Sequence, residues 1–197
     1  MSGVYSQKLD PFQRALPNEP RLLVDTENKV LGPASKRACS EVVEGFSPLH
    51  RAFSLFAFND PDELLLQQRS DTKITFPSLW TNTNTCCSHP LATPTEPEEQ
   101  QQLGVRSAAQ RRLGLKQGIP HSQARVEDIN FVTRILCEAE SSSGWGEHEL
   151  DYILMLRQRE LRVSPSPEEE RGGQRPSPGQ FVSLFNIVSW KYRLLIG

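Results

Sequence analysis

Residues 51–58 (RAFSLFAF) are the part of the sequence that most constrains the fold. The run is apolar almost without a break, which is typical of a strand buried on both faces of a sheet. A turn signal follows at 59–62 (NDPD), and residues 63–68 are apolar enough to form the returning strand. The sequence therefore predicts a sheet built around a buried strand.

Further strands are expected on either side of this one. Residues 21–31 predict a hairpin, because the apolar runs LLV and VL flank the turn-prone DTEN. Residues 129–139 and 147–156 predict two more strands, joined by a turn at 141–144. The polar stretch 32–47 is expected to be a loop.

A helix is predicted over 104–117, where apolar residues recur near helical spacing. Gly118 and Pro120 follow it, as is usual after helix C-termini. Strands, then a helix, then more strands indicate a mixed α/β or α+β fold, a mixed sheet sandwich flanked by helices.

Composition divides the chain into one folded domain with loose ends. A chain of 197 residues can bury a core without metals or disulfides to hold it together. Proline-rich and polar stretches predict disorder or linkers. The expected parts are a disordered N-terminal arm at 1–20, a domain at 21–162, a Pro/Gly/Glu-rich linker at 163–179 and a terminal helix at 180–197.

Charge and hydropathy exclude several classes of partner. The net charge is −2 and no basic stripe is present, so no nucleic-acid partner is expected. No apolar run approaches the ~20 residues of a membrane span, and residues 1–20 lack the apolar core of a secretory signal. The four cysteines show no CxxC pattern, which favours free thiols in a reducing compartment. We expect a cytoplasmic monomer.

Cys87 and His89 form the first candidate site. If this stretch is extended, residues two apart share one face of the strand, which places a thiol beside an imidazole. A thiol acts as an acid or base when a nearby charge adjusts its pKa. A buried cysteine next to a loop histidine explains the same pattern without a function.

Glu147 and Glu149 show the same spacing. Neighbouring carboxylates repel each other unless they share a cation or a proton, and a divalent metal resolves this repulsion. His50 stands at the start of the buried strand, where side chains reach into clefts. With His89, these residues form a nitrogen and oxygen ligand set suited to zinc, manganese or magnesium. A solvated turn and a surface histidine are the alternative interpretations.

Basic residues on separate elements could converge on a diphosphate, which needs several cationic donors. Ordinary surface charge is the alternative for each of them. The candidates are Lys36, Arg69, Lys73 and Arg112.

Six motifs occur in one order along the chain, and together they are far more specific than any single short match. They are LHRAFS (49–54), LLLQQRSDTKITFP (64–77), TCCSHPL (85–91), GVRSAAQRRLGLKQGIP (104–120), WGEHE (145–149) and DYIL (151–154). Over roughly residues 21–167 the chain strongly resembles type I isopentenyl-diphosphate isomerases of the animal type, which have the Nudix fold.

The resemblance implies a Nudix-like mixed sheet and a 1,3-proton shift. Isopentenyl diphosphate would be converted to dimethylallyl diphosphate in isoprenoid and sterol biosynthesis. Cys87 and Glu149 fall on the catalytic thiol and carboxylate. The metal-ligand positions match His50, His89, Glu147 and Glu149, and the diphosphate-binding positions match Lys36, Arg69, Lys73 and Arg112.

The resemblance also implies cofactors and a compartment. One divalent metal is expected at the His/Glu site, as Mg²⁺ or else Zn²⁺ or Mn²⁺, and a second Mg²⁺ with the substrate diphosphate. The family's peroxisomal C-terminal tripeptide is not found at 195–197 (LIG), which favours the cytoplasm.

Four positions depart from the family pattern. The family's first metal-ligand histidine falls on Ser40, an acidic residue of the helix on Lys116, the catalytic tyrosine on Cys137 and a pocket tryptophan on Gln180. An active isomerase is one hypothesis. A non-catalytic relative that binds a diphosphate, or a poorly folding shortened product, is the other. A Nudix hydrolase is disfavoured because RRLGLKQGI lacks the carboxylate pair of a hydrolase box.

Overall fold

The structure of the chain is a computed structural model. It describes residues 18–59, 63–69, 75–87, 96–142, 144–164 and 180–183, with only the backbone of 68, 85–87, 142 and 180–183. Within these residues, no helix has the length and apolar character needed to traverse a bilayer.

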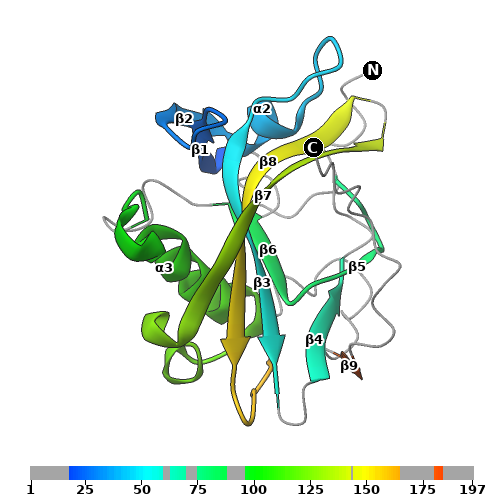
Figure 1. Cartoon of the computed structure of the whole chain (residues 1–197). Helices are drawn as coiled ribbons and strands as arrows, with labels where there is room; N and C mark the ends of the chain where they lie inside the picture. Colours follow the sequence, from blue (N-terminus) through cyan, green and yellow to red (C-terminus); the bar gives the residue numbers. More distant parts are fainter. Residues whose placement is uncertain are drawn as a thin grey trace.

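The strand β3 (His50–Phe58) is the central strand of a mixed sheet that has nine strands among the described residues (Figure 1). One edge of β3 pairs in parallel along its whole length with β8 (Trp145–Arg157). Three antiparallel partners share the other edge, since β1 pairs at His50, β6 at 52–55 and β4 at Phe58. Every residue of β3 except Phe56 is buried, which confirms the predicted buried strand.

The remaining elements extend this sheet or cover it. The further strands are β1 (Pro20–Val24), β2 (Val30–Ser35), β4 (Glu63–Gln68), β5 (Trp80–Thr81), β6 (Asn84–Cys87), β7 (Ile129–Ser142) and β9 (Gln180–Ser183). The helices are α2 (Lys36–Ser40) and α3 (Leu103–Arg112), a π-helical turn (Leu113–Gln117) and 3-10 turns at Gln100–Gln102, His121–Gln123 and Val126–Asp128.

The hydrophobic core lies between α3 and one face of β3 and β8. Alternate residues of the strands point into it, and small residues on α3 let the helix pack closely. Its buried members include Phe53, Leu55, Tyr152, Leu154, Ala108 and Ala109. The opposite face of the same strands carries His50 and Glu149, so strand alternation separates the core from the polar residues.

The predicted helix and hairpins are confirmed. The helix continues from α3 through a π-helical turn and ends at Gly118, whose φ of 61° is the left-handed conformation that favours glycine. β1 and β2 form the first hairpin, and β7 and β8 form the last one.

The predicted loop at 32–47 is wrong in its first part. Residues 32–35 complete β2, which among the described strands pairs with β1 alone. The missing N–H of Pro33 therefore disrupts no second ladder in this part of the chain. The helix α2 follows, and Ser35 caps it by accepting a hydrogen bond from the Ala38 backbone N–H at 3.2 Å.

The predicted ends of the domain also need correction. Pro20, expected in the N-terminal arm, begins β1. Val163, expected in the linker, packs against the core, and the backbone N–H of Ser164 bonds to Gln117. Residues 180–183 form β9 and not the start of a helix, because they pair with the free edge of β4. Residues 1–17, 60–62, 165–179 and 184–197 lie outside the described residues.

Gly104 packs against the backbone that precedes α3. A Cβ there would overlap the carbonyl oxygen of Glu96 and lie 2.7 Å from that of Glu98. We expect Gly104→Ala to lower the free energy of unfolding by about 1–3 kcal/mol, as overpacking does. Urea unfolding followed by circular dichroism measures this change.

Gly114→Ala is the matched control on the same helical segment. Its Cβ would lie 3.3 Å from the exposed His121 side chain and 3.7 Å from the Ile119 carbonyl oxygen, which is an ordinary contact. Alanine also favours the helix over glycine by about 1 kcal/mol. This variant should be neutral or stabilising. Equal destabilisation by the two changes would contradict the packing assigned to Gly104.

Candidate metal centre and active site

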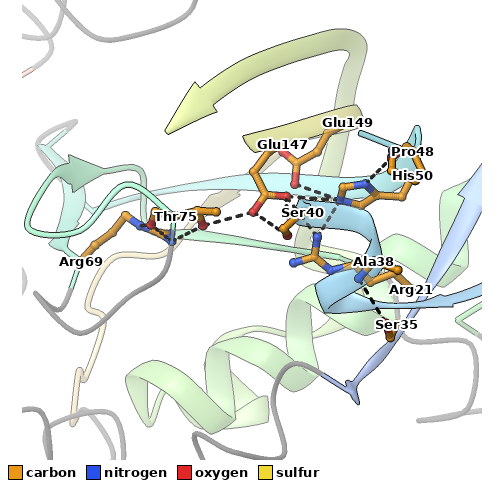
Figure 2. Close-up of polar contacts among 10 residues, drawn as sticks. All are labelled: Arg21, Ser35, Ala38, Ser40, Pro48, His50, Arg69, Thr75, Glu147 and Glu149. Atoms are coloured by element: carbon orange, nitrogen blue, oxygen red, sulfur yellow. Dashed lines mark hydrogen bonds and ion pairs between the residues drawn. The ribbon is translucent and has the colours of Figure 1, made fainter. Parts of the chain in front are cut away.

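His50, Glu147 and Glu149 meet at one end of the β3–β8 pair (Figure 2). His50 pairs in register with Glu149, and Glu147 lies two residues earlier on the same face of β8. His50 Nε2 is 3.5 Å from Glu149 Oε1 and 3.6 Å from Glu147 Oε2, and one ligand atom from each residue lies within 4.8 Å of the others. The expected convergence holds for these three candidates. His89 lies outside the described residues.

Arg21 of β1 lies among these ligands and was not foreseen. Its Nη1 is 2.8 Å from His50 Nε2 and donates to Glu147 Oε2 at 3.1 Å. Leu23 pairs with His50, so Arg21, two residues earlier, shares the face of His50. Local sequence gave no signal for this contact, because it depends on how β1 pairs with β3.

Two hydroxyl groups complete the surroundings of Glu147. Ser40 Oγ donates to its carboxylate at 3.3 and 3.4 Å, and Thr75 Oγ1 donates at 3.1 Å. Arg69 Nη2 in turn donates to the Thr75 carbonyl at 2.8 Å, so a polar chain runs from Arg69 through Thr75 to Glu147 (Figure 2). Ser40, where the family pattern has a histidine, therefore does reach the cluster.

The pKa values of two carboxyl groups on β8 are shifted in opposite directions. Burial raises the pKa of Glu149, but His50, Arg21 and Arg69 outweigh it and hold that pKa below its usual value. Asp151 lies next on the same face and is buried, and burial together with the Glu149 charge raises its pKa well above the ordinary range. Glu149 is thus ionised at neutral pH, whereas the pKa of the neighbouring Asp151 is shifted in the opposite direction.

The donor set suits a divalent cation. His50 Nδ1 lies 3.1 Å from the Pro48 carbonyl, and Arg21 can only donate to Nε2 because a guanidinium accepts no hydrogen bond. Nδ1 therefore carries the proton and Nε2 keeps its lone pair, the tautomer that a metal ligand needs. His50, Glu147 and Glu149 could hold a metal through one nitrogen and two carboxylates.

The backbone places Cys87 near this cluster. Cys87 pairs with Ala52 on β3, and Ala52 pairs with Asp151 on β8. This row of paired residues is two residues along the strands from the His50–Glu149 pair. Position 87 thus stands in the row of paired residues beside the candidate ligands.

The predicted diphosphate-binding residues fall in two places. Lys36 and Arg112 meet at Glu19, whose carbonyl accepts from the Lys36 backbone N–H and whose carboxylate accepts from Arg112 Nη2 at 2.7 Å. Arg69 instead lies beside the carbonyls of Thr75 and Phe76. Lys73 lies outside the described residues.

Two free thiols flank the cluster, Cys39 from α2 and Cys137 from β7. Burial raises the pKa of Cys39 to about 11, with Glu147 and Glu149 adding to it and Arg21 opposing it. Burial, Asp151 and Glu149 raise the pKa of Cys137 to about 12. Both thiols therefore stay protonated at neutral pH.

We expect neither thiol to react readily with iodoacetamide in the folded protein at pH 8. A pKa of about 11 leaves roughly one thiolate in a thousand for Cys39, against about one in ten at its ordinary value of 9.0. Peptide mass spectrometry should find both modified only after unfolding in urea. Rapid labelling of native Cys39 would contradict the assigned burial.

Comparison with known proteins identifies relatives over most of the chain. No family model matches it. The chain is 48% identical over 171 residues to Isopentenyl-diphosphate Delta-isomerase 1 of Bos taurus, covering 86% of this chain and 74% of the relative. It is 44% identical to the Mus musculus protein of the same name, again covering 86% and 74%. It is 48% identical to Isopentenyl-diphosphate Delta-isomerase I of Clarkia breweri, covering 86% of this chain but 59% of the longer plant protein.

Solved structures are similar only at a low level. A MutT protein from Methanosarcina mazei Go1 has a TM-score of 0.48 at 13% identity, covering 73% of this chain and 83% of that one. RenU, a Nudix hydrolase from M. smegmatis, has a TM-score of 0.43 at 15% identity, covering 76% and 81%. Structural similarity at this level does not assign a function. The sequence identity to the mammalian relatives, over almost three quarters of their length, is decisive: the chain belongs to the isopentenyl-diphosphate Delta-isomerase family.

Proposed function

We propose that this protein interconverts isopentenyl diphosphate and dimethylallyl diphosphate by a 1,3-proton shift. The observation that carries the proposal is the convergence of His50, Glu147 and Glu149 on one sheet face, beside the row that contains Cys87. Membership of the isomerase family supplies the substrate. The product is a building block for isoprenoids, including sterols.

The reaction rearranges the substrate without changing its composition. It needs two groups that transfer protons. One proton is added to the terminal alkene carbon, which gives a tertiary carbocation, and another is removed from the carbon on the other side. We assign these transfers to Cys87 and Glu149. The ionised carboxylate of Glu149 also favours a cation forming nearby, because its negative charge lies in a largely dry site.

A divalent metal, held by His50, Glu147 and Glu149 and in the family pattern also by His89, would supply a fixed positive charge at this site. We propose Mg²⁺, with Zn²⁺ or Mn²⁺ as alternatives for the same ligands. A second Mg²⁺ would accompany the diphosphate.

The diphosphate would be bound by Lys36, Arg112, Arg69 and Lys73. The pairing of Arg112 with the Glu19 carboxylate supports this, since that position already binds an anionic oxygen. A diphosphate must compete with Glu19 for Arg112, and with the Thr75 carbonyl for Arg69.

A second candidate function is that of a relative that binds a diphosphate without turning it over. The position of Ser40 favours it, because a hydroxyl that donates to Glu147 replaces an imidazole of the family pattern. A turnover assay with isopentenyl diphosphate, with and without added Mg²⁺, separates the two. Binding of inorganic pyrophosphate in calorimetry with no turnover under either condition would favour the second candidate.

We expect Glu149→Gln to lower kcat by at least about 100-fold, because the amide neither accepts a proton nor carries the charge that favours the cation. The assay follows dimethylallyl diphosphate at saturating substrate and Mg²⁺. Glu138→Gln is the control, since Glu138 is exposed on the neighbouring strand β7. Unchanged turnover in Glu149→Gln would refute the role assigned to Glu149.

We expect Lys116→Glu to raise turnover at saturating Mg²⁺. Lys116 is half-buried and precedes Gln117, which hydrogen-bonds to Asn84 at 2.9 Å on the strand that ends at Cys87. A carboxylate at position 116 would attract the Mg²⁺ that accompanies the diphosphate, whereas the ammonium repels it. An unchanged rate, with Cys87 and Glu149 intact, would mean that Lys116 does not face the substrate phosphates.

A further inference from the structure

The Arg21 guanidinium contacts the same atoms that a metal would use. Its Nη1 is 2.8 Å from the His50 Nε2 lone pair and 3.1 Å from Glu147 Oε2. Nε2 and Oε2 are themselves 3.6 Å apart, so one nitrogen of Arg21 binds both (Figure 2). The geometry of these three atoms limits where a metal can lie.

The distances among these three atoms leave no room for a divalent metal and the Arg21 guanidinium to bind the same ligands together. An ion about 2.1 Å from both Nε2 and Oε2 lies within roughly 3.4 Å of Arg21 Nη1. The N–H that bonds to Nε2 also lies on the lone pair that such an ion requires. A divalent cation and the guanidinium therefore cannot share these ligands in the arrangement seen here.

Burial makes this contact strong. The Arg21 side chain is 8% exposed, those of Glu147 and Glu149 are 15% and 13% exposed, and His50 is fully buried. Water screens charges poorly in such a site, so a cation that offsets the two carboxylates matters more than it would at the surface. Arg21 does so with one charge, through the contacts of its Nη1 with His50 Nε2 and Glu147 Oε2.

The strand β1 fixes the position from which Arg21 reaches the site. Its neighbours Leu22 and Val24 are buried on the opposite side of the strand, and the backbone of β1 pairs with β2 along its length. Only the side chain can leave the ligands. Ser40 also contacts Glu147, and its hydroxyl donates to the carboxylate and so adds no imidazole nitrogen to the set.

We propose that Arg21 is a built-in counter-ion of this site, which competes with a divalent metal for His50 Nε2 and Glu147. Metal enters only when the guanidinium swings away, so the affinity for metal is set by Arg21 as well as by the ligands. The inference deepens the proposed function, because it concerns the regulation of that site, but its test requires no turnover.

The experiment is isothermal titration calorimetry of the full chain with Mn²⁺ alone. Arg21→Met removes the competing charge while keeping the length of the side chain, and we expect it to bind Mn²⁺ at least about tenfold more tightly than the wild type. Arg37→Met is the matched control. It removes the same charge from α2, where Arg37 is 60% exposed and pairs with Glu41, and should leave the affinity unchanged.

A second variant covers the case in which Arg21→Met does not fold. Arg21→Gln is neutral but still donates hydrogen bonds to His50 and Glu147, so it preserves more of the contact. It should also bind Mn²⁺ more tightly, and Mn²⁺ should raise its melting temperature by more than that of the wild type, since a ligand stabilises the folded state according to its affinity. Wild-type affinity in the folded neutral variants overturns the proposal.

The isomerase assay on the same proteins separates this inference from the proposed function. Tighter metal binding in the variants with no turnover in any of them supports Arg21 as the counter-ion and removes the isomerase assignment. Turnover together with wild-type metal affinity in both neutral variants supports the isomerase assignment and overturns the role of Arg21 as counter-ion.

Discussion

Repulsion between Glu147 and Glu149 is the constraint around which this site is arranged. The two carboxyl groups lie on the same face of β8, where their side chains are 15% and 13% exposed. Like charges with so little exposure to solvent need a cation, a proton or hydrogen-bond donors nearby. Arg21 supplies the cation, and Ser40 and Thr75 donate to Glu147. Burial and the charge of Glu149 raise the pKa of Asp151, the next acid on that face.

The register between β3 and β8 places the other residues of the site beside these carboxylates. The two strands are parallel and pair residue by residue, so His50 stands opposite Glu149 and Ala52 opposite Asp151. Small Ala52 also pairs with Cys87 on the other side of β3. The core on the opposite face, including Phe53 and Leu154, holds that register, because a slip of one residue would send the apolar side chains outward.

A site that holds its own cation differs from one built only for a metal. A guanidinium has a fixed charge and a long side chain anchored on a strand, so it stays within reach of the site at any metal concentration, whereas a metal binds according to its concentration. Ser40 and Arg21 belong to the same arrangement: one leaves an imidazole out of the ligand set, and the other offsets the carboxylates that remain.

The sequence by itself determined the features that depend on neighbours along the chain. Strand alternation put Glu147 and Glu149 on one face, the apolar run at 51–58 indicated a buried strand, and Gly118 marked the end of the helix. The ordered motifs also identified the family. Local patterns were misleading where pairing overrode them: residues 180–183 extend a sheet because the free edge of β4 is beside them.

Only the tertiary structure decided what balances the carboxylates. Arg21 is 29 residues from His50 and more than a hundred from Glu147, and its contact with both follows from the pairing of Leu23 with His50. The pKa of Asp151 is raised for a similar reason, since its surroundings come from β3 and β7 as well as from its own strand. The balance of charge is a sum over groups from different strands, and it is set only when those strands are packed together.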